Sequence, residues 1–450
     1  MKLIDKYNVA VPRYTSYPTL PYWENRVSQE QWKQSVKETF LKTNDADGIS
    51  IYIHLPFCDS LCTYCACNTR ITVNHGVEEP YINALLKEWS LYLDLFKEVP
   101  RIRELHLGGG TPTFFSASNL KKLISGLLTN AAVCDDAEFS FEGHPNNTSK
   151  EHLKTLYDLG FRRVSFGVQD LDEKVQLAIN RIQPLENVQK VVAMAREIGY
   201  TSINFDLVYG LPFQEQAKLL KTIQSVIELK PERIAFYSYA HVPWLKPGQR
   251  KFTERDLPDG VQKRMLYESG LNLFKAAGYH DVGMDHFALA SDSLYKAFQN
   301  KTLHRNFMGY TSNYTELMIG LGASSISDTW DAFAQNIKEV EAYTAAVNKN
   351  TFPIFKGHCL SNEDKIVRKH ILNLMCQYQT TWEKDSYNFS VLQEGVLRCI
   401  PLEEDGLLNL IPGHLYVTEA GKSFLRNICL CFDKRYWQTI PKEGVFSKVA

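Results

Sequence analysis

The chain has 450 residues, and its 50 Lys and Arg residues balance its 51 Asp and Glu residues, so the formal net charge is −1 at pH 7. This balance excludes a dedicated nucleic-acid binder, which would carry a basic excess. With 44% hydrophobic and 22% charged residues, the composition is typical of a globular protein of roughly two or three domains. There is no apolar run of about 18 residues and no apolar signal segment, so we expect a cytoplasmic protein without a membrane span.

Residues 1–47 are rich in Tyr and Pro and show no clear periodicity of apolar positions. They are too polar to fold as a domain of their own. We interpret them as an N-terminal arm that closes over the active site of the domain that follows.

Four cysteines fall within ten residues, in the string HLPFCDSLCTYCACN: Cys58, Cys62, Cys65 and Cys67. The first three form a C-x3-C-x2-C pattern. Compact cysteine runs are typical of iron–sulfur sites, whereas structural zinc sites usually add a second ligand pair farther along the chain. Three thiolates can hold three irons of a cubane cluster and leave the fourth iron open to a small molecule. A zinc knuckle and a chance group of buried cysteines remain as alternatives.

Cys67 could be a fourth ligand of the cluster. Such a ligand would close the site and restrict it to electron transfer. We expect instead that Cys67 packs beside the cluster or contacts a bound ligand. The chain has ten cysteines, but four share one loop, which is not the pattern of a disulfide framework. We therefore expect reduced thiols that are available to iron.

From Gly48 onward, short β-branched runs alternate with amphipathic helical stretches such as 79–96 and 215–230. Strand–helix units in series predict a parallel sheet with right-handed crossovers. The fold class that we predict is α/β, a partial parallel barrel of six strand–helix units that spans residues 48–350. The six predicted strands are 49–55, 104–110, 137–145, 162–170, 202–212 and 233–243.

Polar residues and glycines recur at the C-terminal ends of these strands, which is the edge where parallel barrels bind ligands. The cysteine loop follows the first strand at the same edge. The others are Gly108–Thr111, Glu142, Gln169, Asp206 and Ala240. From about Phe352 the alternation is lost, and we predict a small, mostly helical C-terminal domain at 351–450 with a hairpin around GLLNLIPGHLYVT.

The cysteine loop after the first strand and GGTP after the second resemble the radical S-adenosylmethionine (SAM) superfamily. Longer strings resemble one family within it, the oxygen-independent coproporphyrinogen III dehydrogenases (oxidases), and the resemblance covers nearly the whole chain. The strings are PRYTSYP (12–18), CTYCACN (62–68), GMDHFA (283–288), HRNFMGYT (304–311) and RNICLCFD (426–433).

This resemblance implies a 4Fe-4S cluster held by Cys58, Cys62 and Cys65, with SAM on the open iron. It implies an oxidoreductase that converts two propionates of coproporphyrinogen III to vinyls, which gives protoporphyrinogen IX in haem biosynthesis. Cys67 and Tyr52 match catalytic positions. The resemblance also implies a low-potential electron donor of flavodoxin or ferredoxin type and a monomeric enzyme.

The resemblance implies two SAM molecules, and the family's cofactor-binding positions match residues on all six predicted strands and beyond them. In the glycine turn, small residues suit close approach of the backbone to the ligand. One departure is visible, because His144 stands where the resemblance leads us to expect an acidic residue. The matching residues are Tyr52, Gly109, Gly110, Thr111, Glu142, Gln169, Arg181, Asp206, Ala240 and Ile326.

The four propionates of the substrate need cationic partners. Arg13, Arg250, Lys251 and Arg305 are candidates. Arg13 and Arg305 are the best of them, because both lie in family-specific strings that lack helix or strand periodicity. A solvated surface charge is the alternative for each. Two other functions also stay open, a haem chaperone that shares the barrel without the oxidase activity and a haem-degrading radical SAM methyltransferase.

Overall fold

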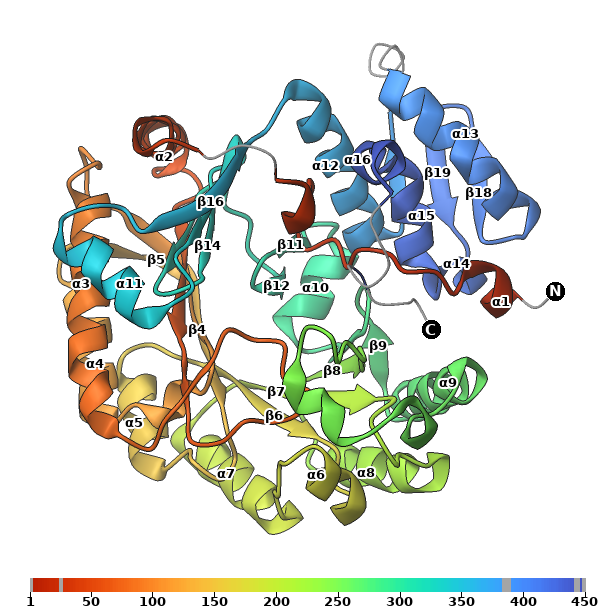
Figure 1. The fold of residues 1–450 in the computed structure, drawn as a ribbon, viewed down its shortest axis with the longest axis horizontal. Helices are drawn as coiled ribbons and strands as arrows, with labels where there is room; N and C mark the ends of the chain where they lie inside the picture. The colour runs from red at the N-terminus through yellow and green to blue at the C-terminus, as the bar shows by residue number, and fades with distance from the viewer. Residues whose placement is uncertain (1–2, 24–26, 383–389, 441–445, 447–450) are drawn as a thin grey trace.

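The computed structural model describes residues 3–23, 27–382, 390–440 and 446. Its main feature is a 12-stranded sheet with the strand order β16-β15-β14-β13-β1-β4-β5-β6-β7-β8-β10-β9, which Figure 1 shows curving around one side of the molecule. Six consecutive strands of this sheet are parallel and match the six predicted ones. They are β1 (Ile49–Leu55), β4 (Arg101–Gly109), β5 (Ala132–Gly143), β6 (Arg163–Gln169), β7 (Ser202–Tyr209) and β8 (Arg233–Ser238).

Helices connect these strands and cover the outer face of the sheet (Figure 1). Their apolar positions face the sheet, as in α4, where Leu120, Leu123, Ile124 and Leu127 are buried at helical spacing. The strands are buried on both faces, which is usual for a parallel sheet between helices and a filled interior. The crossover helices are α3 (Glu78–Leu93), α4 (Ala117–Leu128), α5 (Lys150–Asp158), α6 (Glu173–Ala178), α7 (Leu185–Ile198) and α8 (Gln216–Glu228).

Both edges of the parallel core are extended. β13 (Met318–Leu321) pairs with β1 in parallel, and the antiparallel strands β14 (Ile326–Asp328), β15 (Ala332–Asn336) and β16 (Ile354–Cys359) follow it. The predicted end of the barrel at residue 350 therefore precedes the last strand of its sheet. At the other edge lie β10 (His286–Leu289) and β9 (Tyr279–Asp281), preceded by α9 (Gly260–Ala276). The remaining elements of this part are α10 (Ser293–Gln299), the β11–β12 hairpin (His304–Asn306 and Gly309–Thr311) and α11 (Val340–Asn348).

The N-terminal stretch differs from our prediction, because residues 29–43 do have helical periodicity. They form α2 (Gln29–Thr43), which begins at a capping box on Ser28. Trp32, Val36 and Phe40 recur every four residues and are buried in the main hydrophobic cluster of the protein. The expectation of an aperiodic arm over all of 1–47 was thus wrong for this helix.

The first part of the arm, with α1 (Leu3–Tyr7), runs along the C-terminal part of the chain, as Figure 1 shows. The Tyr14 hydroxyl donates to Asp433 at 3.0 Å, and Nε of Arg426 donates to the carbonyl of Pro12 at 3.1 Å. Tyr14 and Tyr17 are each 2% exposed and belong to the same hydrophobic cluster as the C-terminal helices. The arm is therefore packed into the structure along this stretch.

The C-terminal part is mostly helical, as predicted, and its hairpin is β18 (Leu408–Ile411) with β19 (His414–Val417). The third strand of this small sheet is β17 (Gln379–Thr381). The helices are α12 (Asn362–Gln377), α13 (Ser390–Glu404), α14 (Glu419–Lys422), α15 (Leu425–Phe432) and α16 (Lys434–Gln438). Among the described residues, none of the helices has the length and apolar character that crossing a bilayer would need.

Candidate active site

The cysteine loop lies between two short parallel strands, β2 (Phe57–Cys58) and β3 (Arg70–Ile71), directly after β1. Its middle is fixed by the turn after α6, since the Thr63 amide donates to Ile179 at 2.9 Å and the Asn180 side chain donates to Leu61 at 2.8 Å. The Cys65 amide donates to the Cys62 carbonyl at 3.2 Å and closes a tight turn between them. The C-x3-C-x2-C spacing therefore sits on a loop that is held at its ends and at its centre.

All four cysteines of the loop line one cavity of about 560 Å³ at the C-terminal ends of the parallel strands. The Cys58 thiol lies 3.3 Å from the Thr111 hydroxyl, and the Arg181 guanidinium donates to the Cys62 sulfur at 3.7 Å. Three thiols beside a cation suit a thiolate-bound cluster. Within the described residues no three Cys, His, Asp or Glu side chains surround the position of a single metal ion, so this fit rests on the loop and the cavity.

The glycine turn at the end of β4 is built against the cysteine loop. The Gly110 amide donates to Leu55 at 2.8 Å, and the Thr111 amide donates to Phe57 at 3.0 Å. A Cβ at Gly110 would lie 2.7 Å from the backbone of Pro56, so there is room only for hydrogen. The protein's own backbone thus requires a glycine at this position. The sequence indicates a different reason for a small residue, the close approach of a ligand.

Two carboxylates, Glu142 of β5 and Asp206 of β7, face the same cavity. Glu142 accepts from the Gly109 amide at 3.2 Å. Asp206 accepts from the side chains of Ser165 and Asn204 at 3.0 and 2.9 Å. Burial and the negative charge of Glu142 raise the pKa of Asp206 to about 6. Such a pair can bind an ammonium group or hydroxyl donors of a ligand.

Arg181 and Gln169 line the cavity, and both side chains lie beside Gly167 of β6. The Arg181 guanidinium donates to the Gly167 carbonyl at 2.6 Å, while its Nε has no hydrogen-bond partner among the described residues. An unpartnered buried donor beside a cavity is suited to an acceptor on a ligand. Gln169 ends β6 with φ +66°, and Ala240 lines the cavity just beyond β8.

His144, which replaces the expected acidic residue, also lines the cavity. Burial and the positive charge of Arg181 lower the pKa of His144 to about 3, so the imidazole is neutral at pH 7. Its Nδ1 accepts from the Asn146 amide at 3.1 Å. At this position the chain therefore offers no negative charge to a ligand.

Three of the predicted residues do not line the cavity. Tyr52 lies behind the glycine turn, where its hydroxyl is 3.1 Å from Nδ1 of His54. Ile326 of β14 packs beside the hydrophobic cluster of Trp23 and Phe333. Arg305 is 6% exposed, and its guanidinium lies 4.4 Å above the ring of Tyr310. By contrast, Arg13 reaches the cavity wall and donates to the Ser238 carbonyl at 2.8 Å.

Several cavity residues were not identified from the sequence, among them Ser165 and Tyr237. Ser165 lies inside β6, opposite Asn204 of β7. Because side chains in a strand alternate between its two faces, a count back in steps of two from the strand ends would have pointed to such inward positions.

The comparisons with known proteins agree with this geometry. Residues 52–226 match the family model described as the radical SAM superfamily. Oxygen-independent coproporphyrinogen III oxidase of Helicobacter pylori (strain J99) is 39% identical over 441 residues, which cover 95% of each chain. The protein of the same name from Escherichia coli (strain K12) is 36% identical and covers 100% of this chain and 98% of its own length.

A solved structure of coproporphyrinogen III oxidase from Escherichia coli, described as a radical SAM enzyme, superposes with a TM-score of 0.88 at 35% identity. The match covers 94% of this chain and 97% of the other. Both the sequence identity and the shared architecture extend over almost the full chain, from the arm to the C-terminal helices. The chain therefore belongs to the oxygen-independent coproporphyrinogen III oxidase family of radical SAM enzymes.

Proposed function

We propose that the protein catalyses the anaerobic oxidative decarboxylation of two propionates of coproporphyrinogen III to vinyl groups, which yields protoporphyrinogen IX. For each vinyl formed, a propionate loses one hydrogen atom, one electron and carbon dioxide. The observation that carries this proposal is the near full-length relationship to enzymes named for this reaction, at 35–39% identity. The proposal is also supported by the larger cavity, because both the cysteine loop and the polar strand ends line it.

In this proposal Cys58, Cys62 and Cys65 hold a 4Fe-4S cluster, with SAM beside it. When bound, the cluster and SAM supply the radical that removes a hydrogen atom from the β-carbon of a propionate. The protein binds and orients the ligands and excludes water from them. Glu142 and Asp206 offer acceptors to the amino group and hydroxyls of SAM.

Further parts of the proposal concern stoichiometry and partners. Two SAM molecules are proposed because the polar residues of the resemblance form a large set around one cavity. An external donor of flavodoxin or ferredoxin type is proposed because the cysteine loop reaches the surface, where Leu61 and Cys67 are exposed. A monomer is proposed because one chain provides the cysteine loop, the polar strand ends and Arg13 in one cavity. All ten cysteines are free thiols, which suits a reducing cytoplasm.

An anaerobic assay with the reconstituted enzyme, SAM, a reductant and coproporphyrinogen III tests the function. We expect conversion to protoporphyrinogen IX with the release of carbon dioxide and 5′-deoxyadenosine. Haem binding without vinyl formation would instead identify a haem chaperone. Methyl transfer to haem, with opening of the ring, would identify a haem-degrading methyltransferase.

A further inference from the structure

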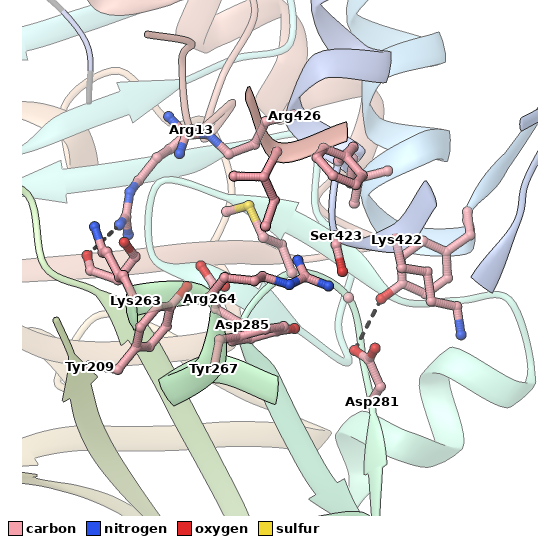
Figure 2. Close-up of a pocket in the computed structure, with 17 residues that line it drawn as sticks. Arg13, Tyr209, Lys263, Arg264, Tyr267, Asp281, Asp285, Lys422, Ser423 and Arg426 are labelled. Atoms are coloured by element: carbon pink, nitrogen blue, oxygen red, sulfur yellow. Dashed lines mark hydrogen bonds between the residues drawn. The ribbon is translucent and has the colours of Figure 1, made fainter. Parts of the chain in front are cut away.

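A second, smaller cavity lies between the barrel and the C-terminal helices and has a volume of about 60 Å³. This is room for a few water molecules or for one carboxylate with its methylenes, and it is far too small for a tetrapyrrole. Its walls come from the arm, from β7 to β9, from α9 and from α14 and α15. Figure 2 shows these side chains converging from the separate elements.

The wall of this cavity carries more positive than negative charge. Five cationic side chains line it, against the two carboxylates Asp281 and Asp285. Two of the cations, on the outer side, have acidic partners outside the cavity: Arg264 contacts Glu268 at 2.6 Å and Lys422 contacts Glu419 at 2.7 Å.

The other three cations, Arg13, Lys263 and Arg426, each donate at least one hydrogen bond to a neutral backbone carbonyl. Arg13 donates to Ser238 at 2.8 Å, and Lys263 donates to Tyr239 at 2.8 Å. Nε of Arg426 donates to the Pro12 carbonyl at 3.1 Å. In Figure 2 the ends of Arg13 and Lys263 lie beside each other.

Asp285 faces these cations and offsets part of their positive charge. Burial and the positive charges of Arg13 and Arg426 lower the pKa of Lys263 to about 8. A buried ammonium group that is held beside two guanidinium groups indicates a site for an anion. Arginine forks match the two oxygens of a carboxylate.

The two cavities share a wall, because Arg13 and Ser238 line both of them. An acidic side chain of a ligand in the larger cavity would therefore meet the smaller cavity at Arg13. The proposed substrate carries four propionates and loses the carboxyl groups of only two.

We propose that the smaller cavity is a carboxylate subsite, in which Arg13, Lys263 and Arg426 bind a propionate that the reaction leaves intact. The proposal rests on the proposed function and adds Lys263 and Arg426 to the residues that position the substrate. A carboxylate of SAM is the other source of the same chemistry, and the experiment below separates the two.

The test uses Lys263→Met in the anaerobically reconstituted holoenzyme. The alkyl part of Lys263 packs close to Gly210, and methionine keeps most of this stem while it removes the charge. Lys263→Arg restores a cation. Lys275→Met is the matched control, because Lys275 lies on the same helix α9, is exposed and contacts Glu419 at 3.2 Å.

Two stable porphyrins serve as probes in fluorescence titrations. Coproporphyrin III carries all four propionates, and protoporphyrin IX keeps only the two that do not react. We expect Lys263→Met to weaken the binding of both by about tenfold or more, the usual effect of a lost charge-assisted hydrogen bond. Lys263→Arg should recover most of the affinity, while SAM affinity and the Lys275→Met control should stay at the wild-type values.

Thermal melting without ligand separates binding from a structural role. Removal of a cation from beside Arg13 and Arg426 relieves repulsion, and this offsets the lost hydrogen bond to Tyr239, so Lys263→Met should melt near the wild-type temperature. A lower melting temperature together with wild-type affinity for both porphyrins would mean that Lys263 only supports the fold and would overturn the proposal.

Other outcomes would also overturn it. Unchanged affinity for both porphyrins would show that the cavity binds no propionate, and weaker binding of coproporphyrin III alone would assign it to a reacting propionate. Weaker SAM binding with unchanged porphyrin binding would assign it to SAM. If the wild-type enzyme itself bound neither porphyrin, the proposed function would fail together with the subsite, whereas every other outcome leaves that function standing.

Discussion

The glycine turn provides the sharpest test of how the cluster loop is supported. In Gly110→Ala, the added Cβ would lie 2.7 Å from the backbone carbon and oxygen of Pro56 and 2.8 Å from the carbonyl oxygen of Phe57. Ordinary contacts of this kind begin at 3.4 Å, so backbone must move by about 0.7 Å. Neither neighbour is a flexible side chain that could turn away. Overpacking of this kind costs about 1–3 kcal/mol.

The movement would reach the cluster directly, because Phe57 precedes Cys58 and accepts the Thr111 amide. We therefore expect Gly110→Ala to lower the melting temperature and also to reduce the iron content after anaerobic reconstitution. Gly248→Ala is the matched control. Its added Cβ would have its nearest neighbour at 3.6 Å, an ordinary contact, so stability and iron content should stay near the wild-type values.

The measurements are thermal melting, iron analysis and the change that SAM causes in the electron paramagnetic resonance signal of the reduced cluster. Wild-type stability and iron content in Gly110→Ala, with the SAM-induced change lost, would refute our reasoning. That result would mean that the glycine is needed for approach of the ligand and that the loop tolerates the methyl group.

Three more predictions follow from the site and the core. Cys58→Ala should lose the cluster, about four irons per chain, while Cys67→Ala should keep it; loss in Cys67→Ala would make Cys67 a ligand. Arg13→Ala should raise KM for coproporphyrinogen III about ten- to a hundredfold and leave SAM affinity alone; an unchanged KM would make Arg13 structural. Burial raises the pKa of Glu88 to about 7, so its contribution to stability is present below pH 4.5 and is lost as pH rises through 7. Glu88→Gln should therefore gain in melting temperature relative to wild type between pH 5 and 8, and a constant difference would contradict this.

The sequence predicts the parallel part of the fold well, because each of its strands is a short, buried, β-branched run between amphipathic helices. It does not predict α2 (Gln29–Thr43), whose apolar stripe is only one residue wide. Trp32, Val36 and Phe40 stand four residues apart in a polar stretch, and their burial becomes evident only once the barrel is there to pack against.

The larger cavity is predictable for the same reason, since strand ends of a parallel barrel meet at one edge. The cysteine loop, the glycine turn, Glu142, Gln169 and Asp206 all line it, as expected. The sequence does not reveal the smaller cavity, because Lys263 and Arg426 read as ordinary charges on helices α9 and α15. Only the tertiary structure brings them to Arg13, which is 250 and 413 positions away in the chain.

The most specific sequence strings meet at the smaller cavity. PRYTSYP supplies Arg13, and its Pro12 carbonyl accepts from Arg426, the first residue of RNICLCFD. GMDHFA supplies Gly283, Met284 and Asp285 to the wall.

HRNFMGYT contacts GMDHFA, because the Tyr310 hydroxyl accepts from the Met284 amide at 2.9 Å. By contrast, the cysteine loop and the glycine turn, the features that the chain shares with radical SAM enzymes in general, line the larger cavity. Under our proposal, radical generation and substrate choice are separated in space, with Arg13 in the wall between the two cavities. Substitutions at Lys263 should accordingly weaken the binding of both porphyrins while SAM cleavage in the absence of substrate proceeds at the wild-type rate.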